Sequence, residues 1–449
     1  MSAAGDPQPS VPQRVAITTL GCKVNAFESE LIAERLRRQH WQVVDGRDVA
    51  DLYIINTCTV TREADRQARQ TVRRLIRQNP DAMVIVTGCY AQMDPDACTR
   101  IPGVDLVLGN DRKLELDRLV PALAARRLPA VMVGDLDEHV SLPEDLLTGY
   151  DGHTRAFIQV QQGCNQSCTF CIIHRARGPS RSLSPALIKR QVERLVANGY
   201  REMVICGVDL GSYGEDLEDR DLRLPELLGE ITAIPADFRV RLSSLDPAHL
   251  SGSLISRLQR DPKLCPHLHL SLQSGNTLIL KRMKRRYTRE TVYQRIARLR
   301  EQVPEVVLSA DVMVGFPTET DAHFLDTQRM VADLEIAFPH VFCYSDRPGT
   351  PAARIPASRH IPVIVRKQRA EALRETASGV RRALLRRRIG SRARVLVEGG
   401  GKPPRGFQRA RSADYLTVMV PAAPEHVGEW LDVEYLSHDG DALIARTLG

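Results

Sequence analysis

Three cysteines in one short run are the residues of this 449-residue chain best suited to chemistry. Cys164, Cys168 and Cys171 follow the spacing C-x3-C-x2-C, which brings three thiolates onto one loop. Three thiolates are one fewer than a closed four-iron cluster needs, so a [4Fe–4S] cluster held there would keep one iron open to a small molecule. A zinc loop is the alternative, because zinc sites usually complete four ligands and His174 stands three residues after Cys171.

A second set of three cysteines lies at the ends of predicted strands. Cys22, Cys58 and Cys89 each close a short apolar run, in a region where strands and helices alternate. Such alternation predicts a parallel sheet that is covered on both faces. Ligands of open α/β sheets sit outside the carboxyl ends of the strands, so these thiols are expected to converge on one point. The alternative is three unrelated buried thiols, which are common for single cysteines.

The elements that must position these cysteines predict an α/β chain. Residues 1–13 are small, polar and proline-rich, which predicts a disordered tail. Residues 14–128 predict a doubly wound parallel-sheet domain, and the acidic residues 129–152 predict a linker. Six βα units over residues 153–376 predict a central open, partial (β/α)6 barrel with its catalytic groups at the strand carboxyl ends. Residues 381–449 predict a small antiparallel β-barrel.

Apolar runs and helical periodicity place the individual elements. The first segment has predicted helices over 26–39 and 61–78, and predicted strands over 15–20, 52–55 and 83–86. The central segment has predicted helices over 185–198 and 289–302, and predicted strands over 156–161, 203–206, 239–243, 267–272, 306–314 and 340–344. The last segment has predicted strands over 392–397, 415–420, 430–435 and 442–446, with an irregular stretch over 399–411.

Composition narrows the class of protein. A content of 43% hydrophobic and 26% charged residues is typical of a globular chain, and the net charge of +7 indicates a polyanionic partner. No apolar run reaches the roughly 18 residues of a membrane span, so no membrane partner is expected. The ten cysteines indicate a reducing compartment, which predicts a cytoplasmic location.

Both sets of cysteines belong to a series of short motifs in a fixed order. The matching strings include Thr19-Leu20-Gly21-Cys22-Lys23-Val24-Asn25, Asn56-Thr57-Cys58-Thr59-Val60-Thr61, Gly88-Cys89-Tyr90-Ala91-Gln92, Leu272-Gln273-Ser274-Gly275, Arg285-Arg286-Tyr287-Thr288 and Val314-Gly315-Phe316-Pro317. From near residue 14 to its end, the chain resembles the methylthiotransferases of the radical S-adenosylmethionine (SAM) class. It looks most like the branch that acts on N6-threonylcarbamoyladenosine (t6A) at position 37 of tRNA.

The resemblance implies two [4Fe–4S] clusters, each with an open iron. One is held by Cys164, Cys168 and Cys171 and the other by Cys22, Cys58 and Cys89. The implied reaction inserts a methylthio group at C2 of t6A37 and uses two molecules of SAM. One SAM methylates the sulfur, and the other is cleaved to a 5′-deoxyadenosyl radical that removes hydrogen from C2. An electron donor such as flavodoxin or ferredoxin and a sulfur source are implied as partners, beside the tRNA anticodon loop.

Contacts to SAM can be predicted only from positions near the cluster loop or at strand ends. The residues so placed are Phe170, Gly207, Arg241, Ser243, Gln273 and Ser274. Ordinary capping of strand ends is the alternative role for each. The chain departs from the family pattern at Asp246, where Glu is more common, and at Thr318, where Gly usually follows Phe-Pro.

Basic residues predict where RNA binds. A helix over 61–78 would carry one stripe of arginines, and two further clusters follow in the chain; the residues are Arg62, Arg66, Arg69, Arg73, Arg77, Lys284, Arg285, Arg286, Arg386, Arg387 and Arg388. The last segment also resembles the TRAM module, a small RNA-binding barrel. A solvated charged face is the alternative explanation for such runs.

Three alternatives to the t6A activity stay open at this point. Two are sibling specificities, for isopentenyladenosine-37 of tRNA or for an aspartate of a ribosomal protein. The third is a non-catalytic iron–sulfur or zinc protein that binds RNA. The string Gly21-Cys22-Lys23-Val24-Asn25 favours the t6A branch.

Overall fold

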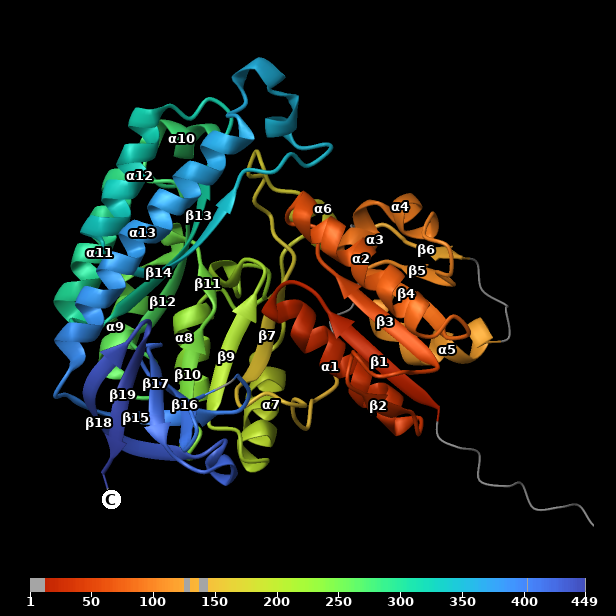
Figure 1. Ribbon diagram of the computed structural model, residues 1–449, viewed down its shortest axis with the longest axis horizontal. Coiled ribbons are helices and arrows are strands. Elements are labelled where there is room, and N and C mark those ends of the chain that lie inside the picture. Colours follow the sequence, from red (N-terminus) through yellow and green to blue (C-terminus); the bar gives the residue numbers. More distant parts are fainter. Residues whose placement is uncertain (1–12, 125–129, 137–143, 402, 449) are drawn as a thin grey trace, which may run out of the picture. The chain divides into compact units, whose positions relative to one another are not determined.

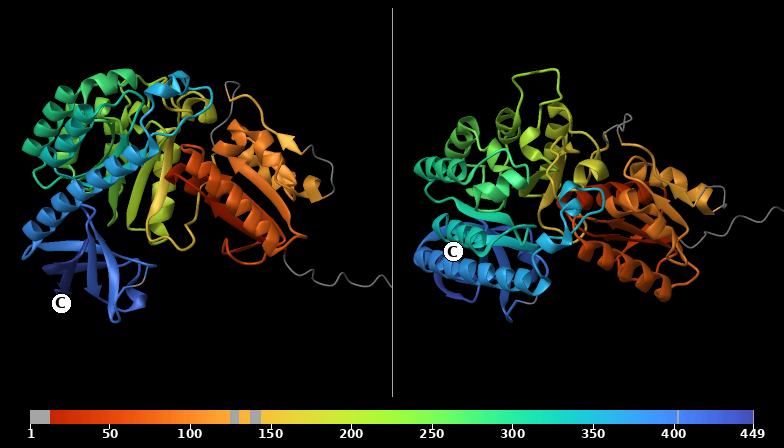
Figure 2. Two further views of the ribbon diagram at one scale, coloured as in Figure 1. Left: turned by 45° about the horizontal axis from the view of Figure 1, so that its top comes forward. Right: turned by 90° about the horizontal axis from the view of Figure 1, so that it is seen from above.

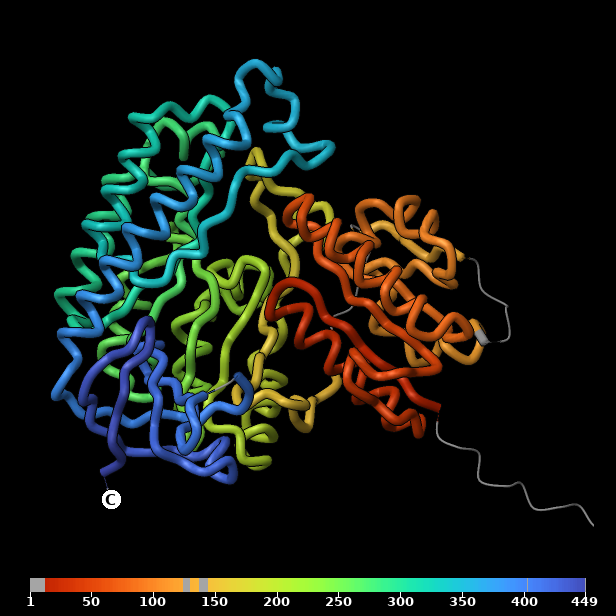
Figure 3. The backbone as a smooth tube through the Cα atoms, viewed as in Figure 1, coloured from red at the N-terminus to blue at the C-terminus, as the bar shows by residue number. Residues whose placement is uncertain are grey.

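The computed structural model describes residues 13–124, 130–136, 144–401 and 403–448 (Figures 1 and 3). These residues form two compact units. The first consists of the described residues up to Asp145 together with Arg175–Gly178, and the second of Leu146–His174 with the described residues from Pro179 onward. All but the last residue of the predicted tail over 1–13 lies outside the described residues.

A six-stranded parallel sheet with the order β2-β1-β3-β4-β5-β6 forms the first unit. Its strands are β1 (Arg14–Thr19), β2 (Gln42–Val44), β3 (Leu52–Thr57), β4 (Met83–Gly88), β5 (Leu106–Leu108) and β6 (Val131–Met132). The helices are α1 (Lys23–Arg38), α2 (Arg62–Gln78), α3 (Cys89–Met93), α4 (Pro95–Thr99) and α5 (Leu116–Ala124). All six residues of β3 are buried, as expected for a central strand that is covered on both faces. The predicted doubly wound sheet is confirmed.

Alternate residues of the strands supply two separate apolar cores. On one face Tyr53 and Ile55 pack with Val72 of α2, and on the other Ile54 packs with Ile32 of α1. The structure differs from the predicted linker at its start, because Val131–Met132 pairs with β5 as the sixth strand. An isolated two-residue strand carries too little apolar pattern to be found from sequence.

The second unit begins with an open series of parallel strands. These are β7 (Ala156–Gln162), β9 (Glu202–Gly207), β10 (Arg239–Leu242), β11 (Ser244–Leu245), β12 (His267–Gln273), β13 (Val307–Val314) and β14 (Ile336–Cys343). They are hydrogen-bonded as two sheets, β10-β9-β7-β8 and β11-β12-β13-β14, in which only the short β8 (Arg181–Ser182) is antiparallel. Because Ser243 alone separates β10 from β11, one sheet continues into the other. The predicted open partial barrel is confirmed.

Helices cover the outer side of these strands, as Figure 2 shows. They are α7 (Pro185–Ala197), α8 (Leu224–Thr232), α9 (Gly252–Arg260), α11 (Arg289–Gln302) and α12 (Asp321–Asp333), with the shorter α10 (Thr277–Arg282) after β12. The short helix α6 (Ile173–Arg177) begins in the second unit and ends in the first. No helix in the described ranges is long and apolar enough to cross a membrane.

A long helix joins the partial barrel to the last segment. Helix α13 (Val363–Arg388) has 26 residues and continues through the boundary predicted at 376–381. Leu373 is buried in its middle, while Leu384 and Leu385 belong to the core of the C-terminal barrel. The two parts therefore share a helix instead of a linker.

The last segment is a closed five-stranded barrel. Its strands are β15 (Arg392–Glu398), β16 (Phe407–Ser412), β17 (Thr417–Pro421), β18 (Trp430–Asp439) and β19 (Ala442–Thr447). Two predictions need correction. β17 and β19 run parallel, so the barrel is not purely antiparallel, and β16 lies in the stretch predicted to be irregular. That strand points Ala410 and Ser412 inward, and small or polar interior residues hide the alternation on which strand prediction depends.

Buried ion pairs hold this barrel against the amino ends of the central strands. The carboxylate of Glu202, at the start of β9, accepts hydrogen bonds from Arg239 and Arg241 of β10. The same two guanidinium groups donate to backbone carbonyls of Arg411, Ser412 and Ala413 in the barrel. The barrel therefore covers the amino ends of the strands and leaves the carboxyl ends for the site.

Candidate functional site

The loop with three cysteines follows the carboxyl end of β7. The Cys171 amide donates to the Cys168 carbonyl (3.0 Å), which folds the loop back on itself. Thr169 donates from its amide to the Met283 carbonyl and accepts at its own carbonyl from the Ala352 amide. The loop is thus fixed to two segments distant in sequence.

Each sulfur of this loop has a hydrogen-bond donor. The amide of Gln166 approaches Cys164 Sγ (3.4 Å), and the amide of Ile173 approaches Cys171 Sγ (3.4 Å). The guanidinium of Arg285 donates to Cys168 Sγ (3.3 Å). Donors to cysteine sulfur are among the features that tune iron–sulfur clusters, so the loop fits such a group.

The thiols are half-buried to buried and close to one another. Burial, Asp209 and the neighbouring thiols raise the pKa of Cys164 to about 12, and burial is the main reason that the pKa of Cys171 rises to about 11. Within the described ranges, no three His, Cys, Asp or Glu residues are arranged to hold a single metal ion. A cluster places each ligand on a different iron, so it needs no such convergence on one ion.

Arg285, predicted to contact RNA, is enclosed by hydrogen-bond partners within the protein. Its Nη2 donates to Asp246 Oδ2 (2.8 Å) and to the Ser271 carbonyl, and its Nε donates to Tyr287 Oη (3.1 Å). The side chain is only 8% exposed. The RNA contact predicted for Arg285 is therefore wrong, because this arginine is enclosed and bonded to a cysteine sulfur. Asp246, where the family commonly has Glu, supplies its carboxylate.

Three residues predicted to contact SAM lie in the loop itself, at Phe170, or at the carboxyl ends of β9 and β12, at Gly207 and Gln273. Phe170 packs on a cluster that contains Met313 and Phe316. Gln273 has a left-handed backbone (φ 63°) and is 7% exposed, yet its Oε1 has no hydrogen-bond partner among the described residues. At Gly207 a Cβ would lie 2.8 Å from Gln161 Oε1, so glycine is needed here for close packing. The Gln273 oxygen is therefore able to accept a hydrogen bond from a ligand.

The other three residues predicted to contact SAM make hydrogen bonds within the protein. Arg241 is directed to Glu202 and the C-terminal barrel, so the SAM contact predicted for it is wrong. Ser274 Oγ accepts from the Asn276 amide (3.2 Å). Ser243 is 5% exposed and continues the strand by donating from its amide to Ile205. The sequence missed Asp209, whose Oδ2 lies 3.8 Å from Cys164 Sγ, because no motif marks it.

The second set of cysteines lies in the first unit, after three of its parallel strands. Cys22 caps the start of α1, Cys58 follows β3, and Cys89 begins α3 directly after β4. Close approach explains the glycines beside them: a Cβ on Gly21 (φ 102°) would lie 2.6 Å from Cys58 Cβ. Burial, Cys89 and Cys22 together raise the pKa of Cys58 to about 12.

Buried charged residues that the sequence did not reveal surround this second set. Arg177 donates from Nε to Cys89 Sγ (3.1 Å) and from Nη1 to Glu28 Oε1 (2.5 Å). Lys113 pairs with the other oxygen of Glu28. Asn25 accepts from Arg177 and donates to the Leu20 and Thr57 carbonyls. The only sequence signal was Asn25, which lies inside the matched motif; the others are far apart in the chain.

The predicted basic residues are in part exposed. On α2, Arg62, Arg66, Arg73 and Arg77 are exposed, with Arg66 paired to Glu63 (2.5 Å), while Arg69 donates to Tyr90 Oη (2.9 Å). In the second unit, Lys284 and Arg286 are exposed.

The arginines at the end of α13 are less available. Arg387 pairs with Glu335 (2.6 Å) and Arg388 with Asp414 (3.0 Å), while Arg386 is exposed. The structure thus shows exposed bases without showing what binds them.

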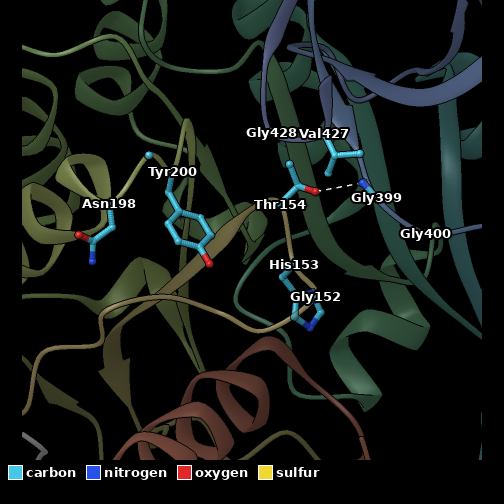
Figure 4. A pocket seen from close by; sticks show the side chains of 10 residues that line it. Gly152, His153, Thr154, Asn198, Tyr200, Gly399, Gly400, Val427 and Gly428 are labelled. Carbon is cyan, nitrogen blue, oxygen red and sulfur yellow. Dashed lines mark hydrogen bonds between the residues drawn. The ribbon is translucent and has the colours of Figure 1, made fainter. Parts of the chain in front are cut away.

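A pocket of about 470 Å³ lies elsewhere in the second unit (Figure 4). Its lining includes His153, Thr154 and Tyr200 together with glycine-rich turns of the C-terminal barrel. Thr154 Oγ1 accepts from the Gly399 amide across its edge (3.1 Å). The lining includes no predicted site residue and no charged side chain.

An open series of parallel strands with a cysteine loop at its carboxyl end defines a protein of the radical-SAM class. Residues 158–331 match the Radical SAM superfamily, and residues 14–109 match the family described as "Uncharacterized protein family UPF0004". Among solved structures, the radical SAM methyltransferase TsrM from Kitasatospora setae superposes with a TM-score of 0.56. It covers 76% of this chain and 77% of its own at 16% identity, which shows a shared fold.

Curated relatives are much closer in sequence. Threonylcarbamoyladenosine tRNA methylthiotransferase MtaB of Rickettsia prowazekii is 40% identical over 385 residues, which cover 86% of this chain and 88% of that protein. Its namesake in Bacillus subtilis is 40% identical over 342 residues (76% and 75%). The tRNA-2-methylthio-N(6)-dimethylallyladenosine synthase of Moorella thermoacetica is 34% identical over 424 residues (93% and 94%). The chain belongs to the family of radical-SAM tRNA methylthiotransferases, and it is an enzyme of this kind with SAM and an iron–sulfur cluster as cofactors.

Proposed function

We propose that this enzyme inserts a methylthio group at C2 of t6A37 in tRNA, with two [4Fe–4S] clusters and two molecules of SAM. The observation that carries the proposal is the pair of separate cysteine trios, each at the carboxyl ends of parallel strands and each with a buried arginine on one sulfur. The relatives named for threonylcarbamoyladenosine are 35–40% identical, against 34% and 31% for the dimethylallyladenosine synthases of Moorella thermoacetica and Desulfitobacterium hafniense, which favours t6A.

The proposal assigns roles to the two trios. Cys164, Cys168 and Cys171 hold the cluster that binds and cleaves SAM, and Cys22, Cys58 and Cys89 hold a second cluster. When bound, the first group supplies the electron for cleavage of SAM and the second presents sulfur to the substrate. The chain itself binds, orients and excludes water, as is usual where cofactors carry the chemistry. We assign Phe170, Gly207 and Gln273 to the SAM site.

Exposed bases supply the tRNA contacts in this proposal. Arg62, Arg66, Arg73 and Arg77 on α2, with Lys284 and Arg286, would meet backbone phosphates, which position RNA without reading its sequence. The α2 stripe starts four residues after Cys58 in the sequence. An electron donor such as flavodoxin or ferredoxin and a sulfur source complete the system.

The test is mass spectrometry of tRNA nucleosides from cells that lack this protein. The proposal predicts loss of the methylthio form of t6A, restored by the wild-type gene and not by a Cys89→Ala copy. Loss of the methylthio form of the isopentenyl nucleoside instead would show that the enzyme acts on isopentenyladenosine-37 of tRNA. Unchanged levels of both would refute a role in tRNA methylthiolation.

A further inference from the structure

Each cysteine trio has one buried arginine with the same arrangement of partners. Arg177 donates to Cys89 Sγ (3.1 Å) and to a carboxylate oxygen of Glu28 (2.5 Å). Arg285 donates to Cys168 Sγ (3.3 Å) and to a carboxylate oxygen of Asp246 (2.8 Å). Both side chains are nearly closed to solvent, at 1% and 8% exposure. Burying an arginine is unfavourable unless it is paired, so each position requires its carboxylate.

The surroundings of Arg177 connect it to all three strand ends of its trio. Its Nη2 donates to Asn25 Oδ1, and the Asn25 amide group donates to the Leu20 carbonyl (2.6 Å) and to the Thr57 carbonyl (3.1 Å). These carbonyls stand two residues before Cys22 and one residue before Cys58. One guanidinium group thus orients, directly or through Asn25, the backbone that precedes two cysteines and the sulfur of the third.

The charges around Arg177 favour a negative group at the cysteines. An arginine guanidinium does not lose its proton in proteins, and here it is paired with the carboxylate of Glu28. Glu28 is held in its ionised form, because Arg177 and Lys113 outweigh the effect of burial and lower its pKa. Arg177 therefore keeps its positive charge beside the buried sulfur of Cys89.

We propose that Arg177 is the positioning residue of the second cluster, which it holds by a hydrogen bond to Cys89 and whose reduction potential it raises through its charge. This inference rests on the second cluster proposed above. A nearby cation stabilises the reduced, more negative state of a cluster, and hydrogen bonds to the ligand sulfurs act in the same direction. Arg177 lies six residues after Cys171 in the sequence, so the segment that carries the radical-SAM cysteines also supplies this group.

The test uses the full chain with Cys164, Cys168 and Cys171 all replaced by Ala, so that only the second cluster is observed. After anaerobic reconstitution, about four irons per chain are expected. On this background Arg177→Met is expected to lower the reduction potential in an EPR-monitored titration and to shorten the life of the cluster under a chelator. Arg177→Lys keeps the positive charge but loses the several N–H donors of the guanidinium group, so the reduction potential of its cluster is expected to lie between those of the background protein and Arg177→Met.

Arg285→Met is the matched control on the same background. It removes an enclosed (8% exposed), carboxylate-paired arginine that lies beside the replaced loop and not beside the remaining cluster, so the signals of that cluster should not change. If Arg177→Met does not fold, Arg177→Gln removes the charge but keeps a hydrogen-bond donor, while Glu28 keeps its pair with Lys113, and the reduction potential is read out in the same way. Unchanged potential and chelator resistance in the Arg177 variants would overturn the inference. Absence of iron in the background protein would instead overturn the proposed second cluster.

Discussion

Replacing Glu202 with Gln tests whether one buried carboxylate holds the C-terminal barrel on the partial barrel. The Glu202 side chain is fully enclosed, and its partners Arg239 and Arg241 are 8% and 3% exposed. Removing the charge leaves two buried guanidinium groups without a counter-ion, although Gln still accepts one hydrogen bond. Breaking a buried pair in this way costs about 3–5 kcal/mol, and we expect the lower end, about 3 kcal/mol.

The expected loss is measured as a change in the thermal unfolding of the full chain. A loss of about 3 kcal/mol corresponds to a fall in the midpoint of roughly 5 °C, since the entropy of unfolding is about 2 cal/mol/K per residue in a unit of this size. Glu434→Gln is the control, because its pair with Arg446 is exposed and worth less than about 1 kcal/mol. A midpoint for Glu202→Gln that matches the control would refute the idea that this carboxylate anchors the barrel.

The dependence on pH gives a second readout. Burial alone would raise the pKa of Glu202, but Arg241 and Arg239 outweigh it and hold the pKa well below its ordinary 4.5. A lowered folded-state pKa stabilises the protein fully above pH 4.5, and this contribution is lost as the pH falls toward the folded value. The difference in stability between wild type and Glu202→Gln should therefore shrink below about pH 4.5. A constant difference down to pH 3 would contradict the assignment.

Three further predictions concern binding and the second trio. Arg73→Ala with Arg77→Ala should weaken tRNA binding and reduce the slope of log affinity against log salt by about 1 per lost phosphate contact. The control Arg47→Ala, at an exposed arginine outside the α2 stripe, should leave the affinity and the slope unchanged. Equal slopes for the two variants would exclude α2 from the interface. Gly88→Ala should lose iron from the second trio, because its Cβ would meet the Thr57 carbonyl at 2.5 Å. The control Gly428→Ala has the same φ of 93° but open space around the new Cβ, so it should keep its iron. Equal iron content in the two variants would refute the collision. Gln273→Leu should weaken SAM binding in an equilibrium assay without lowering the unfolding midpoint, since Gln273 Oε1 has no internal partner among the described residues. Ser274→Ala should lower the unfolding midpoint and leave SAM binding unchanged, because Ser274 Oγ accepts a hydrogen bond from the Asn276 amide. Unchanged SAM affinity for Gln273→Leu would remove Gln273 from the site.

Local pattern was enough to predict most elements and the position of the cysteines after strands. The run Leu52–Thr57 is continuously apolar up to its polar end, so both its strand and the position of Cys58 follow from a few neighbouring residues. The same holds for the loop at Cys164, because the spacing itself defines it. Parallel strands then bring their carboxyl ends to one edge without further information.

Long-range polar partners could not be predicted in this way. Arg285 lies in a basic run and Arg241 in a strand, and neither neighbourhood reveals the buried carboxylates Asp246 and Glu202 that bind them. Arg177 and Glu28 are separated by 149 residues. Thr318 is another position where a distant partner matters. Its φ of 74° favours glycine, the usual family residue there, but the Thr318 hydroxyl accepts a hydrogen bond from Arg282 (2.6 Å).

The central claim is a division of labour between two cysteine trios. Its most direct test compares two triple variants, each reconstituted anaerobically with SAM, a reductant and tRNA that carries t6A37, by measuring 5′-deoxyadenosine and methylthiolated nucleoside together. Replacing Cys22, Cys58 and Cys89 with Ala should leave cleavage of SAM and abolish the methylthiolated product. Replacing Cys164, Cys168 and Cys171 should abolish both. Cleavage of SAM by the second variant, or methylthiolated product from the first, would contradict the account.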